Sequence, residues 1–279
     1  TQRQNQRDYG WVSPAVSSDG QWLAFTVEEK DGKRSQIAVM RVDGSALKKV
    51  TRGGGLKWSP SFSFDGQKII FVASARTNKG RRGVGFFSIH EVDIATGNQR
   101  QLTDLEFYSI LHPRYYRDGE YFIFSGDAPF FANLDTLENF SVREKYVDQF
   151  GENNIFVMND KRNGPEDLKP ILMNGAMSRF EGVSRDSSTI LFLSRTNEID
   201  KSRKRTYTYD LFISKNNEIK RVTRQNGVVK AGDISPDGNR IVFRMSTGTH
   251  PRDVSLFTTR ADGTGLQNID ISPLKELMR

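Results

Sequence analysis

The chain has 279 residues, of which 36% are hydrophobic and 27% are charged, and it carries a net charge of +7 with no cysteine. This composition excludes collagen-like and disordered chains. The absence of cysteine excludes disulfides, thiolate nucleophiles and zinc–thiolate sites. No apolar run approaches the roughly 20 residues that a membrane-spanning helix needs. The positive excess favours acidic partners or anionic surfaces, but it does not indicate a fold.

The N-terminal residues 1–10 are polar and predict a short extension. From residue 11 onward a motif recurs, in which Asp-Gly or a variant of it is followed by a β-rich run that ends in Phe. The five copies run from Asp19 to Phe25, Asp65 to Phe71, Asp118 to Phe124, Asp186 to Phe192 and Asp237 to Phe243. The fourth copy is degenerate, with Ser187 in place of glycine. Repetition at this spacing is the signature of a repeat architecture.

Each copy is preceded by one β-rich run and followed by two more, which are joined by Asp-Gly, Asn-Gly or related turns. These residues accept the positive φ of two-residue hairpin turns, so each unit is predicted to be four antiparallel strands, A to D in chain order. Such a sheet has two faces to cover, and radial stacking covers both. The predicted fold class is all-β: a closed β-propeller of five four-stranded antiparallel blades. The predicted blades are 11–51, 57–103, 111–172, 179–223 and 230–271, followed by a tail at 272–279.

The third unit is longer than the others and predicts an insertion at 127–150. Apolar residues at helical spacing over 134–150, with Asn133 as a possible N-cap, indicate a helix there. The segment 125–153 has a net charge of −4, so we expect it to fold as a lid across basic neighbours. No second Asp-Gly core occurs between Phe124 and Asn154. Five blades are therefore predicted, and six are the alternative.

The repeat resembles the TolB-like β-propeller repeat family. The resemblance is clearest in Ile234-Ser-Pro-Asp-Gly-Asn-Arg-Ile-Val-Phe243 and Arg260-Ala-Asp-Gly-Thr-Gly-Leu266, and it covers nearly all of 11–271. The family includes bacterial periplasmic proteins, envelope lipoproteins, propeller domains beside prolyl-oligopeptidase-like hydrolases, and pectin-degrading lyases. The resemblance implies a periplasmic or envelope-associated protein, with any lipid tether attached outside this chain.

In such blades the B–C loops and D–A connections share one face of the ring, and here they include all the long loops. Segment 74–84 contains four cationic residues and no acid, and segment 194–208 has a net charge of +3. Long loops on a rigid scaffold often carry binding residues. The predicted binding residues are Arg76, Lys79, Arg81, Arg82, Arg203, Lys204 and Arg205. They predict a basic face for an acidic protein or peptide; the alternative is that these residues only keep the protein soluble.

Motifs for catalysis or cofactors are sparse. The sequence has no Gly-x-Ser-x-Gly elbow and no Walker or dinucleotide fingerprint, and His90, His112 and His250 lack metal-ligand spacing, so no metal or cofactor is expected. The basic residues are divided among loops, which disfavours nucleic acid. The three tryptophans fall within the repeat pattern, which favours packing between blades.

The predicted function is a non-catalytic protein- or peptide-binding scaffold of the bacterial cell envelope. It would bind through the long-loop face and the channel mouth. The alternative is a carbohydrate-active enzyme, a glycosidase or polysaccharide lyase acting at the channel mouth. Such enzymes place paired carboxylates there, and the candidates in this chain are Glu181 and Asp233.

Overall fold

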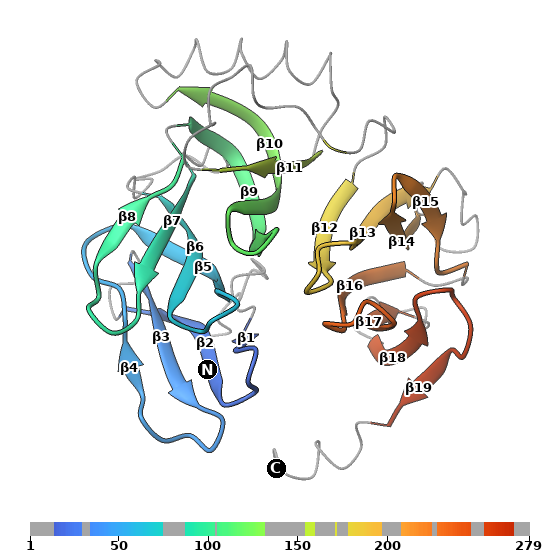
Figure 1. Cartoon of the computed structure of the whole chain (residues 1–279), viewed down its shortest axis with the longest axis horizontal. Coiled ribbons are helices and arrows are strands. Elements are labelled where there is room, and N and C mark those ends of the chain that lie inside the picture. Colours follow the sequence, from blue (N-terminus) through green and yellow to red (C-terminus); the bar gives the residue numbers. More distant parts are fainter. Residues whose placement is uncertain are drawn as a thin grey trace, which may run out of the picture.

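The computed structural model describes residues 14–29, 34–74, 87–103, 105–131, 154–159, 171, 178–196, 208–224, 228–246 and 254–270, without the side chains of 105, 106, 108 and 127–131. The regular elements in these ranges are β-strands, grouped in five antiparallel sheets around a ring (Figure 1). Within the same ranges, no helix has the length and hydrophobicity needed to cross a membrane. The predicted all-β five-bladed propeller is confirmed.

Each sheet is a blade whose strands follow chain order, with the first strand at the centre of the ring (Figure 1). Blade one contains β1 (Ala15–Val16), β2 (Trp22–Glu28), β3 (Ser35–Arg41) and β4 (Lys48–Lys49). Blade two contains β5 (Leu56–Phe62), β6 (Lys68–Ser74), β7 (Ser88–Asp93) and β8 (Gln99–Gln101). Blade three contains β9 (Leu105–Tyr116), β10 (Tyr121–Phe131) and β11 (Asn154–Met158). Blade four contains β12 (Ser178–Val183), β13 (Thr189–Thr196), β14 (Thr208–Lys215) and β15 (Glu218–Arg221). Blade five contains β16 (Val228–Ile234), β17 (Arg240–Ser246), β18 (Val254–Arg260) and β19 (Gln267–Ile269).

Blade three differs from the others in length. Its β10 continues to Phe131 and pairs with β9 as far as Leu105, so residues 127–131, at the start of the expected insertion, are strand. The backbone N–H of Ile171 donates to the carbonyl of Ile155 in β11 at 2.9 Å, on the side where the other blades have a fourth strand. The helix expected at 134–150 lies outside the described residues.

The turn between the first and second strands is built the same way in four blades. In blade two the Ser63 hydroxyl donates to Asp65 at 2.6 Å, and Ser63 Oγ in turn accepts the N–H of Lys68 at 2.9 Å. Asp65 also accepts the N–H of Gln67 at 3.0 Å. The corresponding Ser–Asp pairs are Ser17–Asp19, Ser184–Asp186 and Ser235–Asp237, at 2.5 to 2.6 Å. These bonds fix the turn even in blade four, where Ser187 takes the glycine position with φ 58°.

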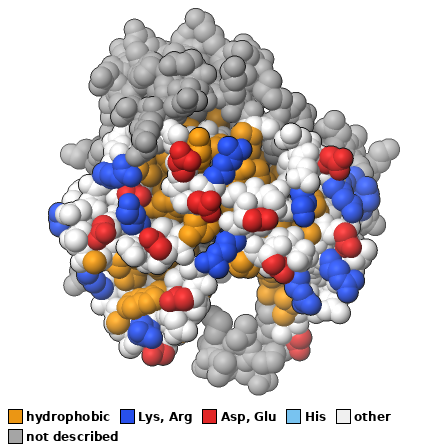
Figure 2. All heavy atoms as spheres, in the orientation of Figure 1, with side chains coloured by type: hydrophobic (Ala, Val, Ile, Leu, Met, Phe, Trp, Pro, Cys, Tyr) orange, Lys and Arg blue, Asp and Glu red, His pale blue; other side chains and the backbone are white. Residues whose placement is uncertain are grey.

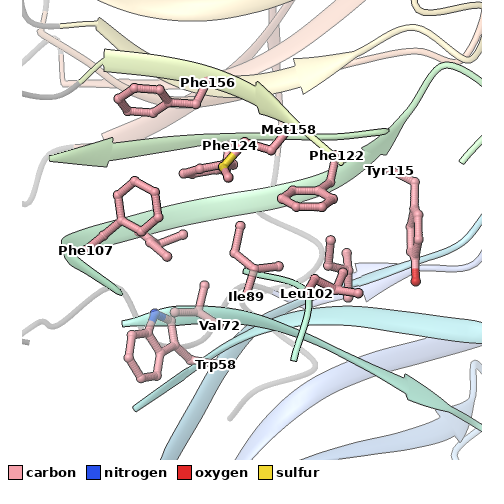
Figure 3. Close-up of a cluster of buried hydrophobic side chains, with 12 residues drawn as sticks. Trp58, Val72, Ile89, Leu102, Phe107, Tyr115, Phe122, Phe124, Phe156 and Met158 are labelled. Atoms are coloured by element: carbon pink, nitrogen blue, oxygen red, sulfur yellow. The ribbon is translucent and has the colours of Figure 1, made fainter. Parts of the chain in front are cut away.

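Among the described residues, four hydrophobic clusters hold the blades together, and each cluster is one junction between consecutive blades. The junction of blades two and three is the largest (Figure 3). There, Trp58 of blade two is 5% exposed, as expected for packing between blades, and Phe107, Phe124 and Phe156 of blade three pack on one another. Centroids of Phe107 and Phe124 are 5.2 Å apart in an edge-to-face arrangement, which adds to the stabilisation from burial.

The repeat explains this packing, because each strand alternates its side chains between two faces. We call the face toward the preceding blade the incoming face and the face toward the following blade the outgoing face. The Phe six residues after each turn Asp lies on the incoming face, and four of these rings are at most 1% exposed: Phe71, Phe124, Phe192 and Phe243. The fifth, Phe25 of blade one, is only partly buried.

On the outgoing faces, blade five differs from the other four blades. The residue five positions after the turn Asp is fully buried in the first four blades: Ala24, Ile70, Ile123 and Leu191. Its equivalent in blade five, Val242, is 39% exposed. We expected a closed ring, but in the described part of the chain no hydrophobic cluster joins blade five to blade one.

Replacing Phe192 by Ala should lower the free energy of unfolding by about 3–5 kcal/mol, because it empties a fully buried site between two blades. The matched variant Phe25→Ala, at the same repeat position, should cost less than half as much, since that ring is only partly buried. Urea unfolding followed by circular dichroism measures both values. Equal costs would contradict this assignment of the junctions.

Candidate functional site in the central channel

The innermost strands line the central channel, and bulges in these strands alter the direction of their side chains. The register of β12 against β13 shifts between Phe180 and Gly182, and the register of β16 against β17 shifts between Val229 and Ala231. The residues at these shifts are Glu181 and Lys230. A bulge adds a residue and redirects neighbouring side chains. These strands are otherwise buried, and the bulges let them carry charged residues near the channel.

A cavity of about 260 Å³ lies at the end of the channel formed by the turns between first and second strands. Four of the residues that line it share one repeat position, four residues before the turn Asp: Ala15, Ser61, Arg114 and Asp233. The sequence motif therefore forms a ring around the channel, and only two of these positions carry a charge.

These two charges meet across blade four because the residue between them has no side chain. Arg114 Nη2 of blade three and Asp233 Oδ2 of blade five are 3.9 Å apart, and their side chains are 25% and 57% exposed. Gly182 holds the same repeat position in blade four, and a Cβ there would lie 2.5 Å from Asp233 Oδ1. The exposed pair contributes little stability in water, so it is open to exchange for a ligand.

Glu181 lies deeper and joins blade four to blade five. It is 2% exposed, accepts from Arg179 Nε at 2.6 Å, and accepts the N–H of Gly232 at 2.9 Å. Arg179 also donates through Nη2 to the Lys230 carbonyl. Burial raises the pKa of Glu181 above its ordinary value, although Arg179 and the Gly232 N–H act in the opposite direction. Both carboxylate oxygens are therefore used within the structure.

A second cavity, of about 450 Å³, lies toward the other end of the channel between blades three, four and five. Val228 and Ser178 begin the innermost strands of blades five and four, and Tyr209 follows the first residue of β14, which places the cavity at the end where the B–C loops emerge. Most of its lining is apolar: Leu111, Leu193, Tyr209, Val228 and Val229. Arg179 and Lys230 add positive charge to one wall.

His112 lies on β9 with φ 53° and is partly buried. Burial, together with the neighbouring charges of Arg114 and Arg179, lowers its pKa to about 3. The imidazole is therefore neutral at physiological pH and adds no charge to the channel. Among the described residues, no three His, Cys, Asp or Glu side chains are grouped as a metal site would require.

The predicted basic residues Arg76, Lys79, Arg81, Arg82, Arg203, Lys204 and Arg205 lie outside the described residues. The first four follow β6, which ends at Ser74, and the others precede β14, which begins at Thr208. Both segments are thus B–C connections. The face shown in Figure 2 carries Lys and Arg side chains interspersed with Asp and Glu, without a patch of one sign.

The structure brings the two predicted carboxylates close enough to interact, since Asp233 contributes to raising the pKa of Glu181. The sequence reading missed Arg179 and Lys230. A signal for them existed, because both stand seven residues before a turn Asp, in consecutive blades. Charges at a strand position that should be buried indicate a channel lining.

No protein-family model matches the sequence, and no curated protein matches it significantly. Solved structures do match. TolB from Acinetobacter baumannii is 21% identical with a TM-score of 0.65, over 92% of this chain and 53% of that one. A putative TolB from Agrobacterium tumefaciens is 16% identical with a TM-score of 0.63, over 92% of this chain and 79% of that one.

An oligogalacturonate lyase solved with manganese is 12% identical with a TM-score of 0.55, over 92% of this chain and 76% of that one. The fold is therefore that of TolB-like propellers, as the repeat indicated. This chain spans about half the length of the Acinetobacter protein. At these identities the similarity establishes the fold alone.

Gly182→Ala should destabilise the protein by about 1–3 kcal/mol, because the added methyl overlaps Asp233 and crowds Ile234. The double variant with Asp233→Ala should recover part of the loss, since it removes the closest atom. Thermal unfolding of both single variants and the double variant measures this coupling. Strict additivity of the two changes would contradict the proposed contact.

Glu181→Gln should reduce the dependence of stability on pH. Because burial raises the pKa of Glu181, the folded state binds its proton more tightly than the unfolded state. The contribution of this group to the free energy of unfolding is therefore lost as pH rises above the ordinary value of 4.5. Urea unfolding from pH 5 to 8 gives the free energy of unfolding of the wild type and of the variant, and the difference between the two values should change with pH. A difference that stays constant with pH would contradict the raised pKa of Glu181.

Proposed function

We propose that this protein is a non-catalytic scaffold that binds an acidic protein or peptide at the long-loop end of its channel. The second cavity carries this proposal, because it combines a largely apolar lining with Arg179 and Lys230. An apolar wall with a few charged groups suits a peptide that places an apolar side chain beside a carboxylate. Its volume of about 450 Å³ is enough for one or two side chains and not for a folded domain.

The topology supports extending this site onto the rim. All blades run in the same direction, so the loops that follow β6 and β13 emerge at the same end of the channel. These loops contain Arg81, Arg82, Arg203 and Arg205. Cationic loops beside a preformed pocket would steer an acidic partner toward it and fix its orientation, with the effect falling as salt increases.

The buried carboxylate argues against the carbohydrate-active alternative. A glycosidase needs two carboxyl groups that reach the substrate, one as acid and one as base or nucleophile. Glu181 is 2% exposed and is held by Arg179 and Gly232, so it could reach a sugar only by breaking a contact between blades. Asp233 is exposed and lines the first cavity, whereas Glu181 lines neither channel cavity, so the two do not form an accessible pair.

The proposed location is the bacterial periplasm or envelope, in keeping with the similarity to two TolB structures. Fractionation of cells that express the tagged natural gene would test this. Recovery in the cytoplasmic fraction would contradict the location without affecting the binding proposal.

Binding can be tested on an array of peptides that pair an apolar residue with Asp or Glu, against arrays in which Lys replaces the acid. We expect binding to the acidic set only. The loop variant Arg203→Glu with Arg205→Glu should weaken binding at least tenfold at 0.15 M salt. The control Lys48→Glu with Lys49→Glu changes the net charge equally on the exposed outer strand β4 and should have no effect.

Loss of binding in the control as well would show that net charge alone is responsible and would contradict a localised site. A polysaccharide screen addresses the rival function. Turnover abolished by Glu181→Gln or Asp233→Asn, in a variant that remains folded, would overturn the scaffold proposal.

A further inference from the structure

Another cavity, of about 400 Å³, lies between blades four and five at the end of the ring where the turns between first and second strands emerge. One wall belongs to the hairpin of blade four formed by β14 and β15, which contributes Ile213, Lys215 and Lys220. The other wall is formed by two turns of blade five, one at Gly238 and one at 260–262. None of these residues lines either channel cavity.

The two turns of blade five are held against blade four. In the first turn, the carbonyl of Pro236 accepts the N–H of Arg185 of blade four at 2.8 Å. In the second turn, the backbone approaches blade four so closely that a Cβ at Gly263 would lie 2.8 Å from the Val222 carbonyl oxygen. The walls of the cavity are therefore preformed, and a ligand could bind with little reorganisation of the protein.

The lining of this cavity carries a positive excess. Three of its side chains are cations on three different strands: Lys215, Lys220 and Arg260. Neither lysine has a hydrogen bond or an ion pair within the part of the chain that the structure describes. Asp262 also lines the cavity, and Thr264 donates to its Oδ1 through its N–H at 2.8 Å and its hydroxyl at 2.6 Å. These bonds, and the charges of Lys220 and Arg260, lower the pKa of Asp262, so three cations against one acid leave +2.

The equivalent position at the junction of blades one and two is used differently. Lys48 of blade one pairs with the third strand at the same position as Lys220 does in blade four. The Lys48 Nζ donates to the carbonyl of Ile94 in blade two at 3.0 Å, and Asp93 stands where blade five has Arg260. The lysine of that junction therefore stabilises the fold, whereas Lys220 is available to a ligand.

We propose that the cavity between blades four and five binds a small organic phosphate monoester. A net charge of +2 complements the dianion, and its oxygens can accept from cations on three strands, whereas a carboxylate has one charge and two oxygens. Ile213, which is 8% exposed, and Ala261 give the cavity an apolar surface for the organic part of the ligand. Its volume is that of a site for a small molecule.

This site lies at the opposite end of the ring from the cavity that carries the proposed peptide site. The two cavities share no residue, so failure of one proposal leaves the other unaffected.

The first test compares three probes by isothermal titration calorimetry at pH 8, where phenyl phosphate is a dianion. Phenyl phosphate should bind at least tenfold more tightly than benzoate, which carries one charge. It should also bind at least tenfold more tightly than inorganic phosphate, which has no apolar part. Equal affinity for phenyl phosphate and either of the other two probes would overturn the proposal.

The second test removes charge from the lining. Lys215→Gln with Lys220→Gln should weaken the binding of phenyl phosphate at least tenfold, because two of the three cations are lost. The control Arg41→Gln with Lys48→Gln makes the same change in net charge at the same repeat positions of blade one and should have no effect. All four side chains are exposed or partly exposed on hairpins, and thermal unfolding verifies that both variants fold. Equal losses in the two variants, or no loss in the first, would overturn the proposal.

The third test locates the bound ester. The chain has no cysteine, so one introduced thiol is a unique label. Asn239 is exposed and lines the cavity, and saturating phenyl phosphate should slow the reaction of Asn239→Cys with a maleimide at least fivefold. Leu47→Cys, at a site that is 67% exposed in blade one, should react at an unchanged rate. Absence of protection at Asn239→Cys would place the ester elsewhere and overturn the proposal.

Discussion

The structure depends on one constraint: a sheet with two apolar faces is stable in water only when both faces are covered. Each interior blade meets it with two neighbours, so β6 and β13 are buried along almost their whole length. Five blades arranged in this way need five junctions, and four hydrophobic clusters are present in the described residues. The terminal blades show the consequence directly, in the partial exposure of Phe25 and the exposure of Val242.

The packing of the blades also determines what the charged residues beside the channel do. Glu181 sits at a bulge between two blades, and its hydrogen bonds to Arg179 and Gly232 connect one sheet to the next. Arg179 serves both purposes, since it holds Glu181 and also lines the apolar cavity beside Lys230. A carboxylate used in this way is unsuited to catalysis, and the hydrogen bonds of Arg179 to Glu181 and to the Lys230 carbonyl fix one cation of the cavity wall in place.

Much of the fold could be predicted because the residues that define the repeat are also the residues that form its turns and its packing contacts. The turn Asp and the Ser before it form the same hydrogen bonds in four blades. In blades two to five, the Phe that follows packs on the preceding blade. Even the degenerate fourth turn was recognised, since Ser187 adopts the positive φ that glycine takes elsewhere. These features are local, and a pattern of adjacent residues is sufficient to specify them.

The site was harder to predict because it depends on what separate blades bring together. The bulges at Glu181 and Lys230 change side-chain direction without changing composition, so strand alternation alone could not place Arg179 in a cavity. The contact of Asp233 with Gly182 requires knowledge of which repeat positions meet across the channel. The exposure of the outgoing face of blade five had a sequence signal, Arg244 at a position that is apolar in blades two and four, but its meaning depends on the packing of the other blades.

The central claim is that neighbouring blades stabilise one another, and that within the described residues no hydrophobic cluster joins blade five to blade one. Hydrogen–deuterium exchange, resolved by peptide along the 279-residue chain, tests it most directly. We predict the slowest exchange in β6, β10 and β13, which lie between two neighbours, and exchange at least tenfold faster in β2 and β17. Uniform protection across all five of these strands would contradict the account.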